Sequence, residues 1–480
     1  MSATVPHLPA LRWGEEYSSL TKLPLKDHRT GVLVGELSQV NAGLVRRDLK
    51  KRAAGGRALA ALGTREVLAC ARKAAELFLE AELPLGDGQT QTGAEYRAQL
   101  SATGGLPLAL VRANQDKVAG VMRELETVAR GLTRGLPLEG LAGGTFEHGG
   151  VPYWFAPEAQ ALGAVLPSNS PGVNALWIPA LAFGVPVALK PGSSDPWTPL
   201  RIVRALVAAG FPREAFALFP TDHEGAAAIL DGCERALLFG DARTTAAWAG
   251  KPSVEIHGPG RSKVWIGADE IEHWERHLDV LVQSIAVNGG RSCVNASCLV
   301  VPRHADAIAE AVAARLVEIR PRRFDDPAAT LSAFADAGMA ERIDGAISAG
   351  LEAPGAREVT AAHRAGPRLA RFEGATYLQP TLVRCTKLDH PLANTEYLFP
   401  FASVVEVSDD QALEWMGDTL VVSAITRAPE NRARLLASSR IGRLNLGPIP
   451  TPSVRWDQPH EGNLFDFLCA RRAVQSADGW

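Results

Sequence analysis

Cys293 is the residue of this sequence whose surroundings best suit a nucleophile. It lies in Val287-Asn-Gly-Gly-Arg-Ser-Cys293-Val-Asn-Ala-Ser, between a predicted helix and a predicted strand, where glycines expose the backbone. A cysteine nucleophile needs a lowered pKa, and backbone N–H groups of a tight loop can stabilise a thiolate. We therefore expect a thiol that solvent can reach. The alternative is an ordinary packing cysteine.

Two polar residues follow successive buried strands. Asn169 comes after the strand at 163–167, and Lys190 ends the strand at 185–190. Parallel strands present their carboxyl ends at one edge of a sheet, so both side chains are expected there. An amide can stabilise an oxyanion, and an ammonium can bind a ribose or phosphate oxygen. The alternatives are an asparagine that only forms its turn and a solvated lysine.

The elements that must position these residues follow from hydrophobic patterns. Apolar residues at helical spacing predict a largely helical region over 41–80 and 92–134, and a glycine-rich region around 151–155 predicts a β excursion. Strands and helices then alternate: strands at 163–167, 185–190, 215–219, 236–239 and 296–301, and helices at 173–183, 199–209, 223–231, 274–284 and 305–319. This order predicts an α/β fold with parallel sheets.

Composition excludes several classes of protein. The 480 residues carry 50 Lys+Arg against 53 Asp+Glu, a formal charge of -3, so neither nucleic acid nor an anionic membrane is an expected partner. Six cysteines without a C-x-x-C pair argue against a disulfide scaffold and against a metal site. The uncharged stretch 159–189 is interrupted by prolines, and 1–12 lacks a signal pattern, so we expect a cytoplasmic protein.

The order of the motifs along the chain resembles that of the aldehyde dehydrogenase superfamily. The similar segments are Pro-Ser-Asn169-Ser-Pro for Pro-Trp-Asn-x-Pro, Leu-Lys190-Pro for Val-Lys-Pro, Phe239-Gly-Asp for Phe-Thr-Gly-Ser, Asn288-Gly-Gly-Arg-Ser-Cys293 for Asn-x-Gly-Gln-x-Cys, and Glu396-Tyr-Leu-Phe-Pro400 for Glu-Ile-Phe-Gly-Pro. Each motif is weak alone, but their shared order covers nearly the whole chain.

The resemblance implies a reaction and a cofactor. Cys293 would attack an aldehyde carbonyl while Asn169 and the Cys293 N–H hold the oxyanion, and hydride transfer to NAD or NADP would leave a thioester. By the same analogy, Lys190 would bind the adenosine ribose, and Glu396 with Leu398 would lie at the nicotinamide end. The segment at Gly240 would lie near the pyrophosphate.

The resemblance also implies a domain organisation. Residues 1–137 and 157–258 would form a Rossmann-like cofactor-binding domain, 259–466 an α/β catalytic domain, and 138–156 with 467–480 a small β bridging arm. A short apolar strand outside both domains presents an edge that needs pairing, so a homodimer or homotetramer is expected.

Two departures from the family pattern concern the cofactor. Ser193 stands where the family has a ribose-binding acid, which removes repulsion toward a 2′-phosphate, so NADP is expected to be tolerated. Asp241 replaces a serine beside the pyrophosphate. A carboxylate there would repel the dianion, so the favoured role for Asp241 is to cap its own helix.

The largest departure concerns the general base. Where hydrolytic members read Glu-Leu-Gly-Gly-Lys, this chain reads Ser253-Val-Glu255-Ile-His257-Gly-Pro-Gly-Arg-Ser, so Glu255 or His257 could activate water. Two residues apart on a strand, the pair would share a face and could act together. Gly250-Lys-Pro with Gly258-Pro-Gly also resembles the branch that transfers the acyl group to coenzyme A.

These observations predict NAD(P)-dependent oxidation of an aldehyde to a carboxylic acid through a cysteine thiohemiacetal and thioester. The alternative is a coenzyme A-acylating aldehyde dehydrogenase, or acyl-CoA reductase, that uses the same cysteine. A cofactor-binding protein without turnover is a third hypothesis, which the altered base motif and Asp241 permit.

Overall fold

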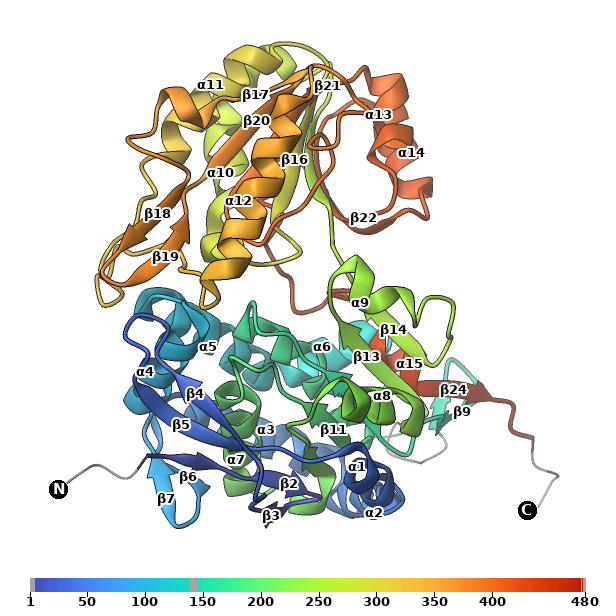
Figure 1. Ribbon diagram of the computed structural model, residues 1–480. Helices are drawn as coiled ribbons and strands as arrows, with labels where there is room; N and C mark the ends of the chain where they lie inside the picture. The colour runs from blue at the N-terminus through green and yellow to red at the C-terminus, as the bar shows by residue number, and fades with distance from the viewer. Residues whose placement is uncertain (1–4, 139–145, 476, 478–480) are drawn as a thin grey trace.

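The computed structural model describes residues 5–138, 146–475 and 477. It has two lobes, each built on a seven-stranded sheet with helices on both faces (Figure 1). Most neighbouring strands in both sheets run parallel, so the predicted α/β class is confirmed.

The first sheet has the order β14-β13-β10-β11-β12-β2-β3. Its strands are β2 (Ala10–Arg12), β3 (Glu15–Tyr17), β10 (Leu162–Val165), β11 (Val187–Lys190), β12 (Phe216–Leu218), β13 (Arg235–Phe239) and β14 (Val254–His257). The first five strands of that order are parallel, and the chain reverses its direction of winding between β10 and β13. Such a reversal opens a crevice at the carboxyl ends of the strands, where α/β proteins bind ligands.

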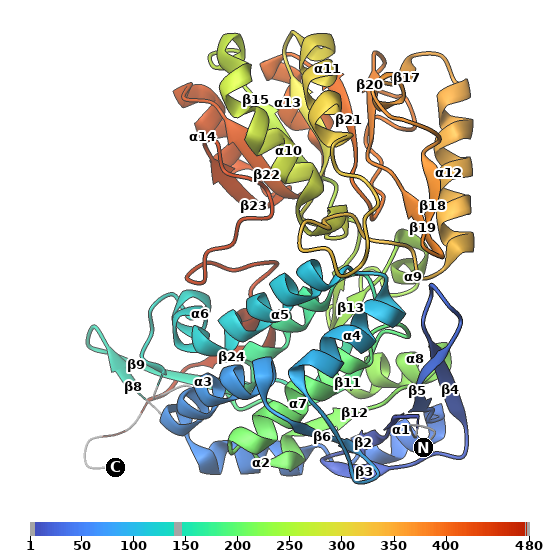
Figure 2. The ribbon, with the colours of Figure 1, turned by 90° about the vertical axis from the view of Figure 1, so that its left-hand side faces the viewer.

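Alternating side chains of these strands enter two different cores. Val187 and Leu189 face the core shared with α3 and α7, whereas Ala188 faces the core shared with α1 and α8. The helices of this lobe are α1 (Ala42–Leu49), α2 (Ala53–Leu62), α3 (Thr64–Glu80), α4 (Gly93–Gly104), α5 (Leu108–Arg123), α6 (Leu125–Leu132), α7 (Trp197–Ala209), α8 (His223–Gly232) and α9 (Ala242–Ala246). Figure 2 shows α3, α4 and α5 together on one side of the lobe.

The helical region predicted for the N-terminal third is confirmed, but short strands precede and interrupt it. These are β1 (His7–Leu8), β4 (Lys22–Lys26), β5 (Leu33–Ser38), β6 (Leu83–Gly86) and β7 (Gln89–Gln91), in addition to β2 and β3. Most of them have two to five residues, too few for an alternating pattern to stand out.

The single helix predicted over 173–183 is wrong. The chain there forms two 3₁₀ helices, Pro171–Leu176 and Ile178–Phe183. Pro179 has no N–H to donate to a helical bond, and the Asn174 side chain donates to the carbonyl of Pro171. Trp177 is fully buried and donates to Asn174, so it is a core residue.

The second sheet has the order β17-β20-β21-β16-β15-β22-β23. Its strands are β15 (Ser262–Ile266), β16 (Ala296–Val301), β17 (Ala356–Glu358), β20 (Thr381–Cys385), β21 (Phe401–Glu406), β22 (Thr419–Ile425) and β23 (Ile441–Leu446). The helices are α10 (Leu278–Ala286), α11 (Ala305–Leu316), α12 (Ala337–Glu352), α13 (Asp409–Met416) and α14 (Pro429–Ala437), and a hairpin joins β18 (Leu369–Phe372) to β19 (Ala375–Leu378). The helix predicted at 274–284 is a 3₁₀ helix, Ile271–His277, followed by α10.

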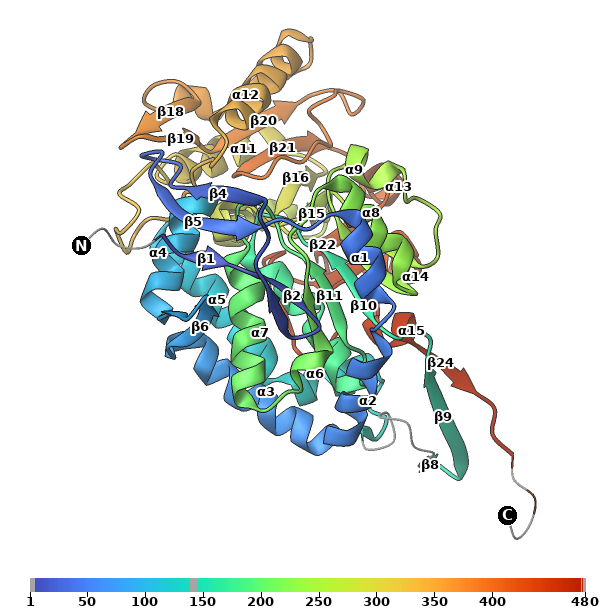
Figure 3. The same cartoon turned by 60° about the horizontal axis from the view of Figure 1, so that its bottom comes forward.

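A third, three-stranded sheet projects from the first lobe (Figure 3). It joins β8 (Phe146–His148) and β9 (Val151–Pro157) to β24 (Cys469–Arg472), which follows α15 (Leu464–Leu468). The predicted β excursion at 151–155 is therefore confirmed, whereas 139–145 lie outside the described residues. β8 and β24 are its edges, and Arg471 stacks on Tyr153 at 4.1 Å from the ring centre.

All six cysteines are free thiols, and all but Cys293 are buried. Within the residues that the structure describes, no helix has the length and apolar character that a membrane crossing requires.

A buried arginine ties α7 to the helical layer. Arg201 is 1% exposed and donates to the carbonyls of Phe78 at 2.8 Å, Gln91 at 2.9 Å and Ala81 at 2.7 Å. Burial lowers its pKa to about 10. The three carbonyl oxygens replace the water molecules that would otherwise solvate the guanidinium.

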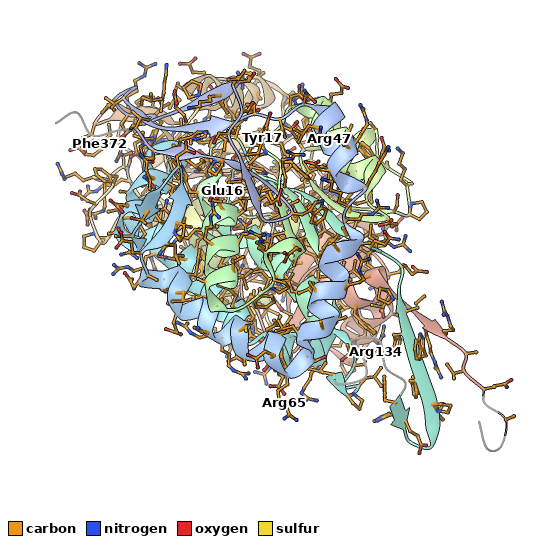
Figure 4. The ribbon with its side chains drawn as sticks, turned by 90° about the horizontal axis from the view of Figure 1, so that it is seen from below. Glu16, Tyr17, Arg47, Arg65, Arg134 and Phe372 are labelled. Carbon is orange, nitrogen blue, oxygen red and sulfur yellow. The ribbon has the colours of Figure 1, made fainter. Side chains whose placement is uncertain are left out.

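We predict that Arg201→Met lowers the free energy of unfolding by about 3 kcal/mol, because buried carbonyl oxygens lose their charged donors. Urea denaturation followed by circular dichroism measures the change. Arg65→Met is the control, since Arg65 points into solvent from α3 (Figure 4). If Arg201→Met and Arg65→Met lowered the free energy of unfolding equally, the three hydrogen bonds of Arg201 would contribute nothing to stability.

Candidate active site

The loop that carries Cys293 owes its shape to left-handed backbone. Asn288, Gly289 and Gly290 have φ values of 58°, 65° and 65°, which glycine adopts without strain. A Cβ at Gly290 would lie 2.3 Å from the nitrogen of Pro400, so only glycine allows the loop to pack there. The loop thereby presents Cys293 between the two lobes.

The connection from β14 to β15 meets this loop at the nucleophile. A Cβ at Gly260 would lie 2.1 Å from the carbonyl oxygen of Cys293, and Ser262 donates its hydroxyl to that oxygen at 2.9 Å. The backbone of Cys293 is therefore fixed against the segment that joins the two sheets.

The Cys293 thiol is half-buried and faces a carboxylate. Its Sγ lies 3.2 Å from Oε1 of Glu461, to which it donates. Burial raises the pKa of Cys293 well above its usual range, and the charges of Glu461 and Glu396 raise it further. A cysteine nucleophile needs a lowered pKa, whereas the two carboxylates near the sulfur act in the opposite direction, so the thiol needs a group that takes its proton.

The other oxygen of Glu461 bonds to His257. Oε2 of Glu461 accepts from Nδ1 of His257, and both side chains are only 6% exposed. On the far side of the imidazole, Nε2 lies 3.4 Å from Oε1 of Glu255. The ring also stacks on Phe239, with ring centres 4.5 Å apart. Glu255, His257, Glu461 and Cys293 thus form one line of contacts.

The charges of this line follow from its hydrogen bonds. Burial opposes a charge on His257, but the bond to Glu461 and the charges of Glu461 and Glu255 together outweigh burial and raise the pKa of the imidazole. Burial would likewise raise the pKa of Glu461, yet the His257 bond lowers it to about 2. Burial raises the pKa of Glu255. The hydrogen bond between Glu461 and His257 thus favours the charged forms of both groups.

Asn169 lies in the same cavity as the thiol. Its amide donates to the carbonyl of Arg291 at 2.7 Å, which orients the side chain and leaves a second N–H on the same nitrogen. In the part of the chain that the structure describes, the N–H of Cys293 has no hydrogen-bond acceptor. Both donors are therefore available to an oxyanion formed beside Sγ.

The cavity that contains Cys293 has an empty volume of about 990 Å³. Its lining is mostly apolar and comes from α5, α6, the two 3₁₀ helices after β10 and the segment 454–464. A second cavity of about 870 Å³ borders Glu255, His257 and Glu461 beside Gly258 and Gly442. The carboxylate of Glu461 thus borders both cavities.

Lys190 and Ser193 lie at the carboxyl edge of the first sheet, as predicted. Lys190 pairs with Val165 in the register of β10 and β11, and burial lowers its pKa. Its ammonium has no hydrogen-bond or ion-pair partner within the described residues. Ser193 is exposed, whereas Asp195 is buried and accepts from the N–H of Thr198 at the start of α7. No carboxylate of this loop is therefore free beside Lys190.

The remaining predicted cofactor residues are Gly240, Asp241, Glu396 and Leu398. Asp241 caps α9 by accepting from the N–H of Thr244 at 2.8 Å, so the capping role is confirmed, and Gly240 immediately precedes it. Oε2 of Glu396 accepts from the N–H of Arg261 at 2.6 Å, and burial raises the pKa of this carboxyl to about 7. Leu398 is 36% exposed.

Glu461 is the residue that sequence reasoning missed. It lies in the segment Trp456-Asp-Gln-Pro-His-Glu461-Gly, which resembles no family motif and offers several polar candidates without an order among them. The sequence signal for this segment is the pair Gly462-Asn463. In the structure Gly462 has a φ of 60°, and Asn463 caps α15. A glycine before a cap marks a constrained turn, but the pattern does not tell what the turn contacts.

A comparison with family models decides the relationship. The model described as aldehyde dehydrogenase family matches residues 105–463. The chain belongs to the aldehyde dehydrogenase family. The matched range includes Asn169, Cys293 and Glu461, and the resemblance seen in the order of motifs is confirmed.

Individual relatives are distant. N-succinylglutamate 5-semialdehyde dehydrogenase of Chromobacterium violaceum is 27% identical over 315 residues, which are 62% of this chain and 60% of that protein. The chain thus aligns with less than two thirds of that relative. Among solved structures, an indole-3-acetaldehyde dehydrogenase in complex with NAD+ superposes with a TM-score of 0.79 at 19% identity, over 97% of this chain and 96% of that one. The aldehyde dehydrogenase KauB of Pseudomonas aeruginosa gives the same values. These likenesses show the aldehyde dehydrogenase fold.

We predict that Glu461→Gln shifts the pH dependence of Cys293 alkylation by iodoacetamide toward lower pH by about one unit or more, since a negative charge beside the sulfur is removed. Rates measured from pH 6 to pH 11 on the intact enzyme report this shift. Glu158→Gln, which changes a carboxylate that pairs with Arg235 away from the sulfur, is the control. An unchanged profile in Glu461→Gln would contradict the electrostatic role of Glu461.

Proposed function

We propose that this protein oxidises an aldehyde to a carboxylic acid with NAD or NADP, through a thioester on Cys293. The observation that supports this most is the arrangement around Sγ. A carboxylate that can take the thiol proton and two N–H groups suited to an oxyanion border the same apolar cavity.

The chain's own residues divide the first step between them. Glu461 accepts the proton of the thiol, and Sγ of Cys293 attacks the aldehyde carbon. The side chain of Asn169 and the N–H of Cys293 then stabilise the oxyanion of the thiohemiacetal. A bound nicotinamide would supply the acceptor for the hydride of this carbon. The proton on Glu461 leaves toward the second cavity.

Hydrolysis of the thioester needs a base beside Cys293. We assign this role to Glu461 and His257 as a pair, because Glu461 is the carboxylate in contact with the sulfur and His257 holds its other oxygen. The base takes a proton from water, the hydroxyl adds to the acyl carbon, and the C–S bond breaks to return the thiolate. Glu255 is assigned to positioning His257 through the 3.4 Å contact.

The residues at the sheet edge fit the dinucleotide. An ammonium without a partner, Lys190, suits ribose hydroxyl oxygens, and the exposed Ser193 leaves room for a 2′-phosphate because Asp195 is occupied at α7. By the family resemblance, the segment at Gly240 would receive the pyrophosphate, and Glu396 with Leu398 would lie at the nicotinamide end. We therefore propose that NADP is accepted as well as NAD.

Transfer of the acyl group to coenzyme A remains the alternative outcome. The names of the relatives described above lend it no support, and the Glu461 carboxylate beside the sulfur, bonded to His257, favours water as the acceptor.

The finer organisation is also a proposal. Residues 1–137 and 157–258 would bind the cofactor, 259–466 would carry the catalytic residues, and 138–156 with 467–480 would join subunits of a cytoplasmic dimer or tetramer. The projecting sheet with β8 and β24 as open edges supports this assembly.

The test follows absorbance of the reduced nicotinamide with a panel of aldehydes, with NAD or NADP, in the presence and absence of coenzyme A. We expect sustained turnover without coenzyme A, and none in Cys293→Ala, which should still bind the cofactor. A single burst that continues only after coenzyme A is added would replace hydrolysis with acyl transfer. Strict dependence on NAD would reject the role given to Ser193.

We predict that His257→Asn slows acid formation by about 10²–10⁴-fold while the initial burst persists, because the base of the second step is lost. Stopped-flow absorbance separates the burst from the steady state. Glu255→Gln should slow the steady state less, since it removes a contact of His257 and no contact of the sulfur. A larger loss in Glu255→Gln would transfer the base role to Glu255.

A further inference from the structure

Lys117 is a charged residue that lines the cavity of Cys293 and has no role in the proposed reaction. It lies on α5, and its stem packs against the backbone of Gly172, where an added Cβ would approach Cδ of Lys117 to 3.4 Å. Within the described residues, its ammonium has no hydrogen-bond acceptor and no ion-pair partner. Burial lowers the pKa of Lys117, helped by the charge of Arg443 and only partly opposed by the charges of Cys293 and Glu461. An ammonium without a partner in apolar surroundings costs free energy.

Lys117 stands where two chambers meet. An outer chamber with an empty volume of about 1410 Å³ shares five lining residues with the cavity of Cys293: Lys117, Ser292, Val294, Val454 and Trp456. Among the residues that line this outer chamber, Lys117 is the only charged one. A molecule that passes inward to the thiol therefore meets one positive charge in a largely apolar passage.

The protein's own anions do not satisfy this charge. Glu461 is engaged by His257 and Cys293, and Glu255 lies behind the imidazole. Arg455, which also lines the inner cavity, is 77% exposed and forms two bonds with Asp457, so it does not compete for a ligand in the passage. The half-buried Arg443, whose charge also reaches Lys117, donates to the carbonyl of Thr451 and lines neither chamber. The missing partner must come from outside the chain.

We propose that the aldehyde oxidised by this enzyme carries a carboxylate, and that Lys117 binds this carboxylate while Cys293 attacks the carbonyl. The substrate class is the semialdehydes of dicarboxylic acids. One ammonium as the charged group of the outer chamber's lining suits one negative charge better than a phosphate dianion, for which paired donors or an arginine fork are usual. The inference rests on the proposed oxidation and names its substrate class.

The test compares succinic semialdehyde with its neutral methyl ester, methyl 4-oxobutanoate. We expect the enzyme to prefer the charged aldehyde by about 10- to 100-fold in kcat/KM, mostly through KM, and Lys117→Met to remove this preference. Lys117→Arg should retain it, because the charge remains. Arg112→Met, an exposed position on the same helix, should leave both substrates unchanged.

Binding is also measured without turnover, as protection of Cys293 from iodoacetamide by succinate. We expect succinate to protect Cys293 in the unaltered enzyme and in Lys117→Arg but not in Lys117→Met. This result supports the anion site even if no aldehyde is oxidised. In that case only the proposed reaction fails. The inference is overturned if succinate gives no protection or if the enzyme uses both aldehydes equally. It is also overturned if Lys117→Met slows both aldehydes alike and slows alkylation of Cys293, since Lys117 would then act on the thiol.

Discussion

The hydrogen bonds of the Glu461 carboxylate join three distant parts of the chain. His257 ends a strand of the first sheet, Cys293 lies on a loop before a strand of the second, and Glu461 comes from the segment after the last strand of that sheet. A buried ion pair repays its loss of hydration only when its geometry is good, so each part must be placed accurately. The two lobes and the terminal segment are therefore required together for one interaction.

Much of the fold could be predicted because it depends on local patterns. Strand β16 has the predicted bounds, 296–301, since six buried residues between two helices form a clear run. The N-terminal strands β1 to β5 escaped prediction because their pairing is between segments of two to six residues, whose partners no local pattern identifies. The 3₁₀ helices at 171–183 show a third case, in which proline changes the type of helix without changing its burial.

The residues of the site also fall into those that local patterns predict and those that they do not. Asn169, Lys190 and Cys293 were identified because each follows or precedes a strand, so the topology alone brings them to an edge. Glu255 and His257 were expected on one face of their strand, and the 3.4 Å contact agrees with this. The protonation of Cys293 could not be predicted, because it depends on Glu461, whose approach results from the path of the whole terminal segment.

The close approach at Gly260 has a consequence for how the molecule exchanges its ligands. The connection between the two sheets touches the carbonyl oxygen of Cys293 with no space for a side chain, and Ser262 bonds to the same oxygen. A hinge motion that opened the lobes at this connection would move Cys293 away from Glu461. Ligands would therefore enter and leave without a hinge at this connection, through the cavities that already reach Cys293 and Glu461.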